Sequence, residues 1–369
     1  MRSSKNLLFF SLFLCAITLC ISLLYYNFFS VELNSFGENI EKNGFQSIII
    51  PDTILYYSTI DFQNVIQSIF LSAVKNTIGP SFIWYISNGN WEYTILINGI
   101  LLFLTSRYII FLSQKLKIKQ SKTLVSLLIL IIQPNTIFYM IGALKEIPSM
   151  FLLTGFVYYF LERKYIKLFF FMILLVTFRA QLVFPLVFVL ILRFLSIKKS
   201  TKMSLCIMIL ISAFYPILKE LTIFANGAAD VYREIESGSG LGQKIEYIRS
   251  NVPLLSILAI LIRIFQTITE PVFIFFKISE NGNFQIFRFV MVSSFFLTGY
   301  YFIHCLKNIY LSLKHKIIVN PDIAWILAII ILIGFPTAGF SFIQYRYLYP
   351  LFPLILISAN CNFNNFKKI

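Results

Sequence analysis

The residues best able to do chemistry lie within residues 134–194, where three charges interrupt an otherwise apolar stretch. Lys145 and Glu146 are adjacent, and Arg179 stands alone between two apolar runs. Ionisable side chains inside apolar, membrane-like segments are costly and mark functional sites by default. Long basic side chains at a segment boundary can instead extend their charge to lipid headgroups. We expect Arg179 to be functional, whereas both interpretations stay open for the Lys145–Glu146 pair.

A carboxylate and two tyrosines form a second candidate group in the stretch PDTILYY. Asp52 follows a proline, and an aspartate in this position commonly caps the start of a helix. The same carboxylate could act as a general acid or base. Tyr56 and Tyr57 follow closely and add two aromatic rings to the group. The sequence does not decide cleanly between Asp52 and Glu146 as the base; we favour Asp52, because Glu146 adjoins a lysine and an opposite charge makes a carboxylate a poorer base.

Further arginines offer planar guanidinium groups that can grip two phosphate oxygens at once. Arg346 lies in QYRYLYPLFP between tyrosines, where it could also serve only as part of an interfacial aromatic belt. Arg288 is a weaker candidate of the same type. We find no Ser-His-Asp set, HExxH, P-loop or GxGxxG motif, and the five cysteines show no metal-ligand spacing. The sequence therefore predicts no metal and no cofactor.

The composition is that of a membrane protein. Of the 369 residues, 58% are hydrophobic and 13% charged, whereas soluble domains carry about 25% charged residues. The net charge of +15 could suggest nucleic acid as a partner. The basic residues, however, cluster in short loops between apolar runs, which is the pattern of cytoplasmic loops in membrane proteins. We therefore expect a lipid bilayer and no nucleic acid.

Hydropathy and charge together predict an all-α polytopic integral membrane protein whose single transmembrane domain covers residues 1–369. Residues 168–195 begin and end beside basic loops but are too few for two full spans, so we expect two short helices that meet as a hairpin near residues 178–181. About ten spans result, with both termini cytoplasmic: 7–29, 91–113, 124–141, 149–161, the hairpin, 203–221, 287–306, 323–339 and 347–359.

The acidic loops alternate with the basic ones and are expected on the opposite side of the membrane. Residues 31–90 and 222–286 form the two long extracytoplasmic segments. Within the first, residues 62–74 have the helical spacing of a helix lying on the interface. Residues 252–276 are apolar but should have both ends outside, so we expect a re-entrant or interfacial segment there.

Four short motifs resemble those of polytopic glycosyltransferases that use lipid-linked sugars. They are PD-x3-YY after the first span, P-x3-FY-x4-LKE at residues 134–146, FR at residues 178–179, and R-Y-x2-P-x2-P at residues 346–353. The size and the Phe-, Ile-, Lys- and Asn-rich composition resemble bacterial O-antigen and capsular polysaccharide polymerases within that class.

The resemblance implies an enzyme of the bacterial inner membrane that transfers a growing glycan from one undecaprenyl diphosphate to the sugar of another, on the outer face. Arg179 and Arg346 would match the diphosphate-binding arginines, and Asp52 or Glu146 the acidic residue that activates the acceptor hydroxyl. Lys145 and Arg288 would complete the substrate-binding set, with Tyr56 and Tyr57. A chain-length regulator and a flippase are the protein partners that the resemblance suggests.

Alternatives remain beside this expectation. The spaced arginines of two outer loops reported for some polymerases are not clear in residues 222–251, which places a two-loop capture mechanism in doubt. Another lipid-linked-sugar transferase of the same broad fold would carry similar motifs. A lipid-linked oligosaccharide transporter should show internal symmetry and charges spread through the midplane, and the sequence shows neither. A non-catalytic membrane scaffold is the third alternative.

Overall fold

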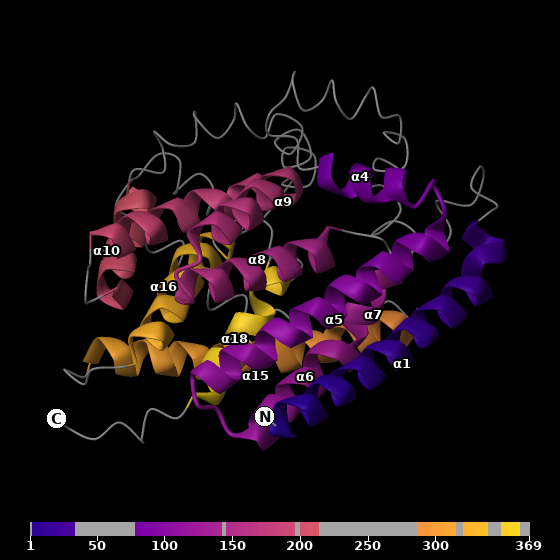
Figure 1. Ribbon diagram of the computed structural model, residues 1–369, viewed down its shortest axis with the longest axis horizontal. Coiled ribbons are helices and arrows are strands. Elements are labelled where there is room, and N and C mark those ends of the chain that lie inside the picture. The colour runs from indigo at the N-terminus through magenta and orange to yellow at the C-terminus, as the bar shows by residue number, and fades with distance from the viewer. Residues whose placement is uncertain are drawn as a thin grey trace, which may run out of the picture. The chain divides into compact units, whose positions relative to one another are not determined.

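The computed structural model describes residues 2–33, 78–141, 145–195, 200–213, 286–314, 320–338 and 348–361 (Figure 1). All regular elements in these ranges are helices, and no strand occurs among them. The all-α prediction is therefore confirmed for this part of the chain. The predicted interfacial helix at 62–74 and the predicted re-entrant segment at 252–276 lie outside the described residues.

The chain divides into two compact units, which are described separately. The first comprises Met1–Val183 with Gln285–Ser294, and the second comprises Phe184–Phe284 with Phe295–Ile369. The helices of the first unit are α1 (Arg2–Leu33), α4 (Ile78–Ile86), α5 (Trp91–Lys115), α6 (Gln120–Ile132), α7 (Pro134–Ile141), α8 (Glu146–Leu161) and the first part of α9 (Tyr165–Phe194).

The second unit contains the end of α9 and most of α15 (Ile286–Lys314). It also holds α10 (Ser200–Ala213), α16 (Pro321–Ala338), a short 3-10 turn (Tyr349–Leu351) and α18 (Phe352–Asn360). Helix α10 packs along α16, and α16 packs against α18. The amide of Asn308 donates a hydrogen bond of 2.6 Å to the carbonyl of Ser358, which ties α15 to α18.

Three of the described helices are long and apolar enough to cross a membrane: Ser4–Leu24 within α1, α5, and α9. The count becomes four if α6 and α7, which meet at a bend of 44°, form one broken span. Shorter apolar helices include α8 and segments within α10 and α16. These helices support the assignment as a membrane protein, while the ten spans and their orientation stay predictions.

The bend between α6 and α7 divides the predicted span at 124–141 into two helices. Gln133 has extended backbone angles (φ −57°, ψ 142°) and stands directly before Pro134. A proline ring disfavours helical angles in the residue before it, so α6 ends there. Pro134 itself begins α7, where its missing N–H costs nothing because the first turn has no intrahelical acceptor for it. The bend could thus have been predicted from the proline.

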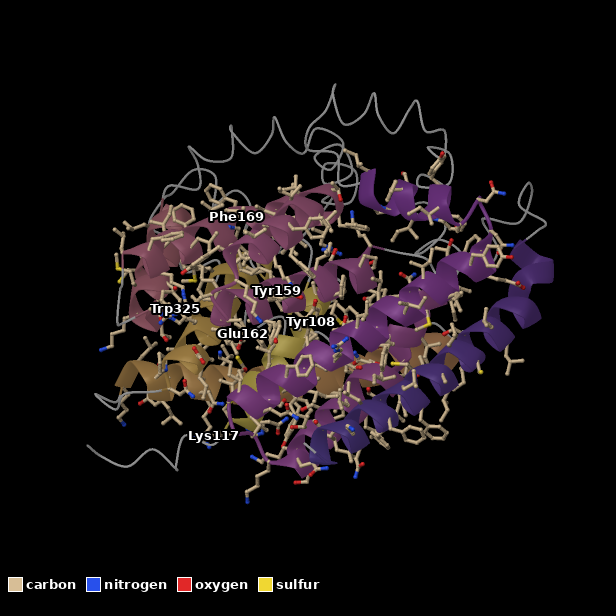
Figure 2. All side chains as sticks on the ribbon, viewed as in Figure 1. Tyr108, Lys117, Tyr159, Glu162, Phe169 and Trp325 are labelled. Atoms are coloured by element: carbon tan, nitrogen blue, oxygen red, sulfur yellow. The ribbon has the colours of Figure 1, made fainter. Side chains whose placement is uncertain are left out.

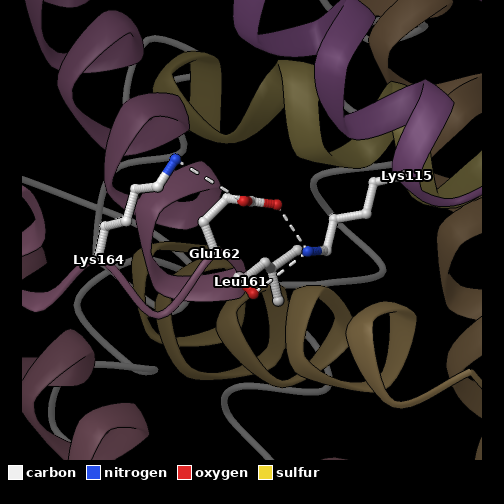
Figure 3. A network of polar contacts seen from close by, with 4 residues as sticks. All are labelled: Lys115, Leu161, Glu162 and Lys164. Carbon is white, nitrogen blue, oxygen red and sulfur yellow. Dashed lines mark hydrogen bonds and ion pairs between the residues drawn. The ribbon is translucent and has the colours of Figure 1, made fainter.

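A polar network joins the carboxyl ends of α5 and α8 (Figure 3). Lys115 Nζ donates to Glu162 Oε1 at 2.7 Å and to the carbonyl of Leu161 at 3.3 Å, and Lys164 Nζ lies 3.8 Å from Glu162 Oε2. The hydrogen bond from Lys115 is the main reason that the pKa of Glu162 lies below its usual value. The two basic loops that begin at these helix ends therefore lie at the same end of the unit, as their predicted common side of the membrane requires.

Aromatic rings fill the space between α5, α8 and α9 in the first unit. Tyr108 lies beside Tyr159, with their hydroxyl oxygens 3.3 Å apart (Figure 2). The ring of Phe171 on α9 packs against both tyrosines and against Phe151. Opposite Phe171, α8 carries Gly155, where an added Cβ would overlap ring carbons of Phe171, one of them at 2.7 Å. A residue without a side chain at 155 therefore lets α8 and α9 approach closely.

Gly155→Ala should lower the melting temperature, because Phe171 is held by neighbouring rings and cannot move away cheaply. Overpacking of this kind costs about 1–3 kcal/mol, against a gain of about 1 kcal/mol from the higher helix propensity of alanine. Gly299→Ala is the matched control, since a Cβ there would find no atom of the described residues within 4 Å. Thermal unfolding in one detergent compares the three proteins, and a Gly155→Ala protein that melts at or above the wild type would contradict this packing.

Candidate functional site

The candidate site is a buried ion pair between α8 and α9. Arg179 Nη2 donates to Glu146 Oε1 at 2.6 Å, and the side chains are only 1% and 0% exposed. Both residues belong to the first unit. Removing two charges from water costs several kcal/mol for each ion, and a good geometry between them repays only part of that cost. A buried pair of this kind often adds little to the stability of the folded protein. Its presence therefore favours a functional role.

Glu146 is positioned by the start of α8. It is the first residue of this helix, after Lys145 at the N-cap. A carboxylate is favourable there because the start of a helix carries the positive end of the helix dipole. Pro148 lies in the same turn, where proline is tolerated. Almost all of the helix is apolar and buried, which fixes α8 firmly in the core and Glu146 with it.

Arg179 is positioned by a break in α9. Its backbone angles (φ −152°, ψ 76°) are the non-helical ones inside this element, which joins two helices across a kink. The break predicted at residues 178–181 is thus confirmed at Arg179, while the return of the chain as a hairpin stays a prediction. A break frees backbone N–H and C=O groups from their helical hydrogen bonds. Polar groups nearby then have to bond to these freed backbone groups.

Helix α4 packs beside this break, and the sequence analysis did not predict it as a helix. A Cβ added to Gly79 would lie 2.6 Å from the ring of Phe178, the residue before Arg179, so glycine is required for this approach. Trp84 packs edge-on against Trp91 at 5.2 Å between ring centroids. The signal was present in the sequence: an apolar run with a proline in its first turn that ends in a turn at Asn88 and Gly89.

Trp91 connects the start of α5 to the same region. Its indole Nε1 donates a hydrogen bond of 2.6 Å to the carbonyl of Ile141, the last residue of α7. Glu92 follows in the first turn of α5 and is exposed. The amino ends of α5 and α8 therefore lie at the end of the unit opposite the network of Lys115 and Glu162.

Ser149 is a polar residue of the site that the sequence analysis missed. It lies three residues after Glu146 on α8, and residues at this spacing are neighbours on one helix face. Its side chain is fully buried, and its hydroxyl makes no hydrogen bond to any residue in the described part of the chain. In the sequence, a serine three positions after the glutamate would have predicted a hydroxyl on the same helix face as Glu146.

The structure brings together Glu146 and Arg179, with Lys145 half-buried next to Glu146. The carboxylate of Glu146 thus pairs with the guanidinium of Arg179, and its role as a base stays a prediction. Arg288 lies in α15. The other candidates, namely Asp52, Tyr56, Tyr57 and Arg346, fall outside the described residues, so their placement stays a prediction. Among the described residues, no group of three His, Cys, Asp or Glu side chains could hold a metal ion.

The chemistry open to this site is anion binding in a dry environment. A guanidinium group offers five N–H donors in a fixed plane that suits carboxylates and phosphates. Its attraction for an anion is stronger where water is excluded. No family model, no curated protein and no solved structure matches this chain.

Proposed function

We propose that the protein is a membrane glycosyltransferase that polymerises undecaprenyl-diphosphate-linked oligosaccharide repeat units, for O-antigen or capsule, on the outer face of the bacterial inner membrane. The observation that carries the proposal is the buried Glu146–Arg179 pair at a break in an apolar helix. Charged groups inside apolar helical membrane proteins are rare and by default mark a functional site. The motif resemblance to this polymerase class supplies the substrate.

The proposed reaction needs one cationic group and one base. The acceptor hydroxyl attacks the anomeric carbon of the donor glycan and gives its proton to Asp52. The bond from the anomeric carbon to the diphosphate oxygen breaks, and its electron pair leaves with the lipid diphosphate. Arg179 stabilises the negative charge that develops on that oxygen, which is where a preorganised donor contributes most. Arg346, Lys145 and Arg288 would bind further phosphate oxygens, and Tyr56 and Tyr57 would stack on a sugar.

Arg179→Lys tests the proposal, because lysine keeps the charge but lacks the planar fork. We expect the rate of polymer formation to fall by about 100-fold, the usual cost of one transition-state donor. The assay uses purified protein in liposomes with lipid-linked repeat units, and electrophoresis of the glycan reads the chain length. Arg193→Lys is the control in the same helix, since Arg193 is half-buried and lies over the ring of Trp325.

Each outcome of this assay bears on the proposal. Wild-type chain lengths from Arg179→Lys would contradict a role for Arg179 in diphosphate binding. If the wild type adds a single sugar and no more, the protein is a single-sugar transferase of the same broad class. Movement of the intact lipid-linked unit across the bilayer without bond formation would indicate a transporter instead.

A further inference from the structure

We propose that Glu146 occupies the anion site of Arg179 while no substrate is bound, and that the lipid diphosphate displaces it. Glu146 and the diphosphate would then compete for one guanidinium group, so that Glu146 sets the affinity of the site. This inference rests on the proposed function. It makes Glu146 a positioning and competing residue rather than the base.

The carboxylate of Glu146 and a phosphate oxygen would use the same donor of Arg179. Arg179 is only 1% exposed, and its Nη2 is already engaged by Glu146 Oε1 at 2.6 Å. A phosphate oxygen cannot take the same position at the same donor while the carboxylate is there. A diphosphate that binds through Nη2 therefore has to displace Glu146. The pair also explains how a guanidinium is kept buried without substrate, since a buried charge without a counter-charge would be strongly destabilising.

The surroundings of Glu146 favour an anion with more oxygens than a carboxylate. Glu146 begins the 16-residue helix α8, where the positive end of the helix dipole favours an anion. Ser149 adds a fully buried hydroxyl without a hydrogen-bond partner in the described part of the chain, one turn from Glu146. Lys145 adds a positive charge at the N-cap. A diphosphate could bind Arg179, Ser149 and Lys145 together. The carboxylate of Glu146 has only two oxygens and is tethered to α8, so it cannot bind all of them.

This exchange, in which the diphosphate displaces Glu146 from Arg179, predicts that removing the charge of Glu146 tightens the binding of diphosphate. Only protein in which the Glu146–Arg179 pair is open can bind the diphosphate at Nη2. The apparent dissociation constant for diphosphate therefore rises as the fraction of open protein falls. If the pair is closed about ten times more often than open, Glu146→Gln should bind diphosphate about tenfold more tightly than the wild type. A glutamate that only holds Arg179 in place predicts the opposite sign, because its loss would let the arginine move.

The experiment measures binding of farnesyl diphosphate to the full-length protein in nanodiscs of neutral lipid. Glu146→Gln should bind more tightly, and Glu146→Asp should also do so, since a carboxylate one methylene shorter reaches Arg179 less well. Glu146→Asp keeps the buried charge and guards against poor folding of the neutral variant. Glu92→Gln removes an exposed carboxylate near the same end of the unit and should leave the affinity unchanged.

Failure of the exchange can be told from failure of the proposed function. If the wild type binds farnesyl diphosphate, Arg179→Lys weakens binding, and both Glu146 variants bind equally or more weakly, the exchange is wrong and the function stands. If farnesyl diphosphate binds no better than farnesol, or binds Arg179→Lys as well as the wild type, both proposals are wrong. Inorganic pyrophosphate in place of farnesyl diphosphate shows whether the diphosphate alone is recognised.

Discussion

Arg179→Met should destabilise the folded protein by about 3–5 kcal/mol, because it leaves the carboxylate of Glu146 buried without its counter-charge. Glu146→Gln should cost a similar amount, since the guanidinium is then the buried charge. The double variant Glu146→Gln/Arg179→Met removes both charges and should recover most of the loss, as replaced buried pairs usually do. Unfolding in mixed micelles by increasing amounts of sodium dodecyl sulfate measures the three free energies.

The control for this cycle is Arg193→Met, which removes a half-buried cation over the Trp325 ring, 5.7 Å from its centroid. A contact of that kind is worth about 1 kcal/mol, so its loss should be much smaller. If the two single changes are mild and simply additive, the pair is not coupled in the folded protein. The buried geometry on which the site depends would then be wrong.

Asp52→Asn should abolish polymer formation while the protein still inserts and folds. Asparagine keeps the shape and any hydrogen bond that caps a helix, but it cannot accept the proton of the acceptor hydroxyl. The loss should be about 100-fold or more, the usual contribution of a general base. Lipid-linked single repeat units should accumulate in cells, and chromatography of extracted lipids measures them.

Glu146→Gln is the paired variant for this test. It keeps a hydrogen-bond acceptor for Arg179, so its folded fraction should still make polymer. Normal polymer from Asp52→Asn together with none from Glu146→Gln would reverse the two roles. Polymer from both variants would remove the chemical basis of the enzyme assignment.

The sequence was sufficient to identify the two charges but not their pairing. Glu146 and Arg179 stand out because they interrupt apolar runs, and the 28 residues between two basic loops predict a break near Arg179. Their contact spans 33 positions in the chain. Neither periodicity nor charge order says which buried groups meet, because that depends on how α8 packs against α9. Packing in turn depends on details such as Gly155, whose missing side chain allows the close approach.

Other features were predictable in part. The all-helical class follows from composition, and the alternation of basic loops predicts the common end of α5 and α8 that Lys115 and Glu162 now mark. The bend before Pro134 follows from proline geometry, although a hydropathy window averages across it. Helix α4 was missed because nine residues are too short for a span, and its role beside Phe178 depends on tertiary contact.

The central claim is that the Glu146–Arg179 site binds the diphosphate and is not merely a structural ion pair. The most direct measurement is the polymer assay in liposomes on Glu146→Gln/Arg179→Met, the variant expected to fold without either charge. We predict a folded protein that forms no polymer and leaves the lipid-linked units intact. Polymer of wild-type length from this double variant would contradict the claim.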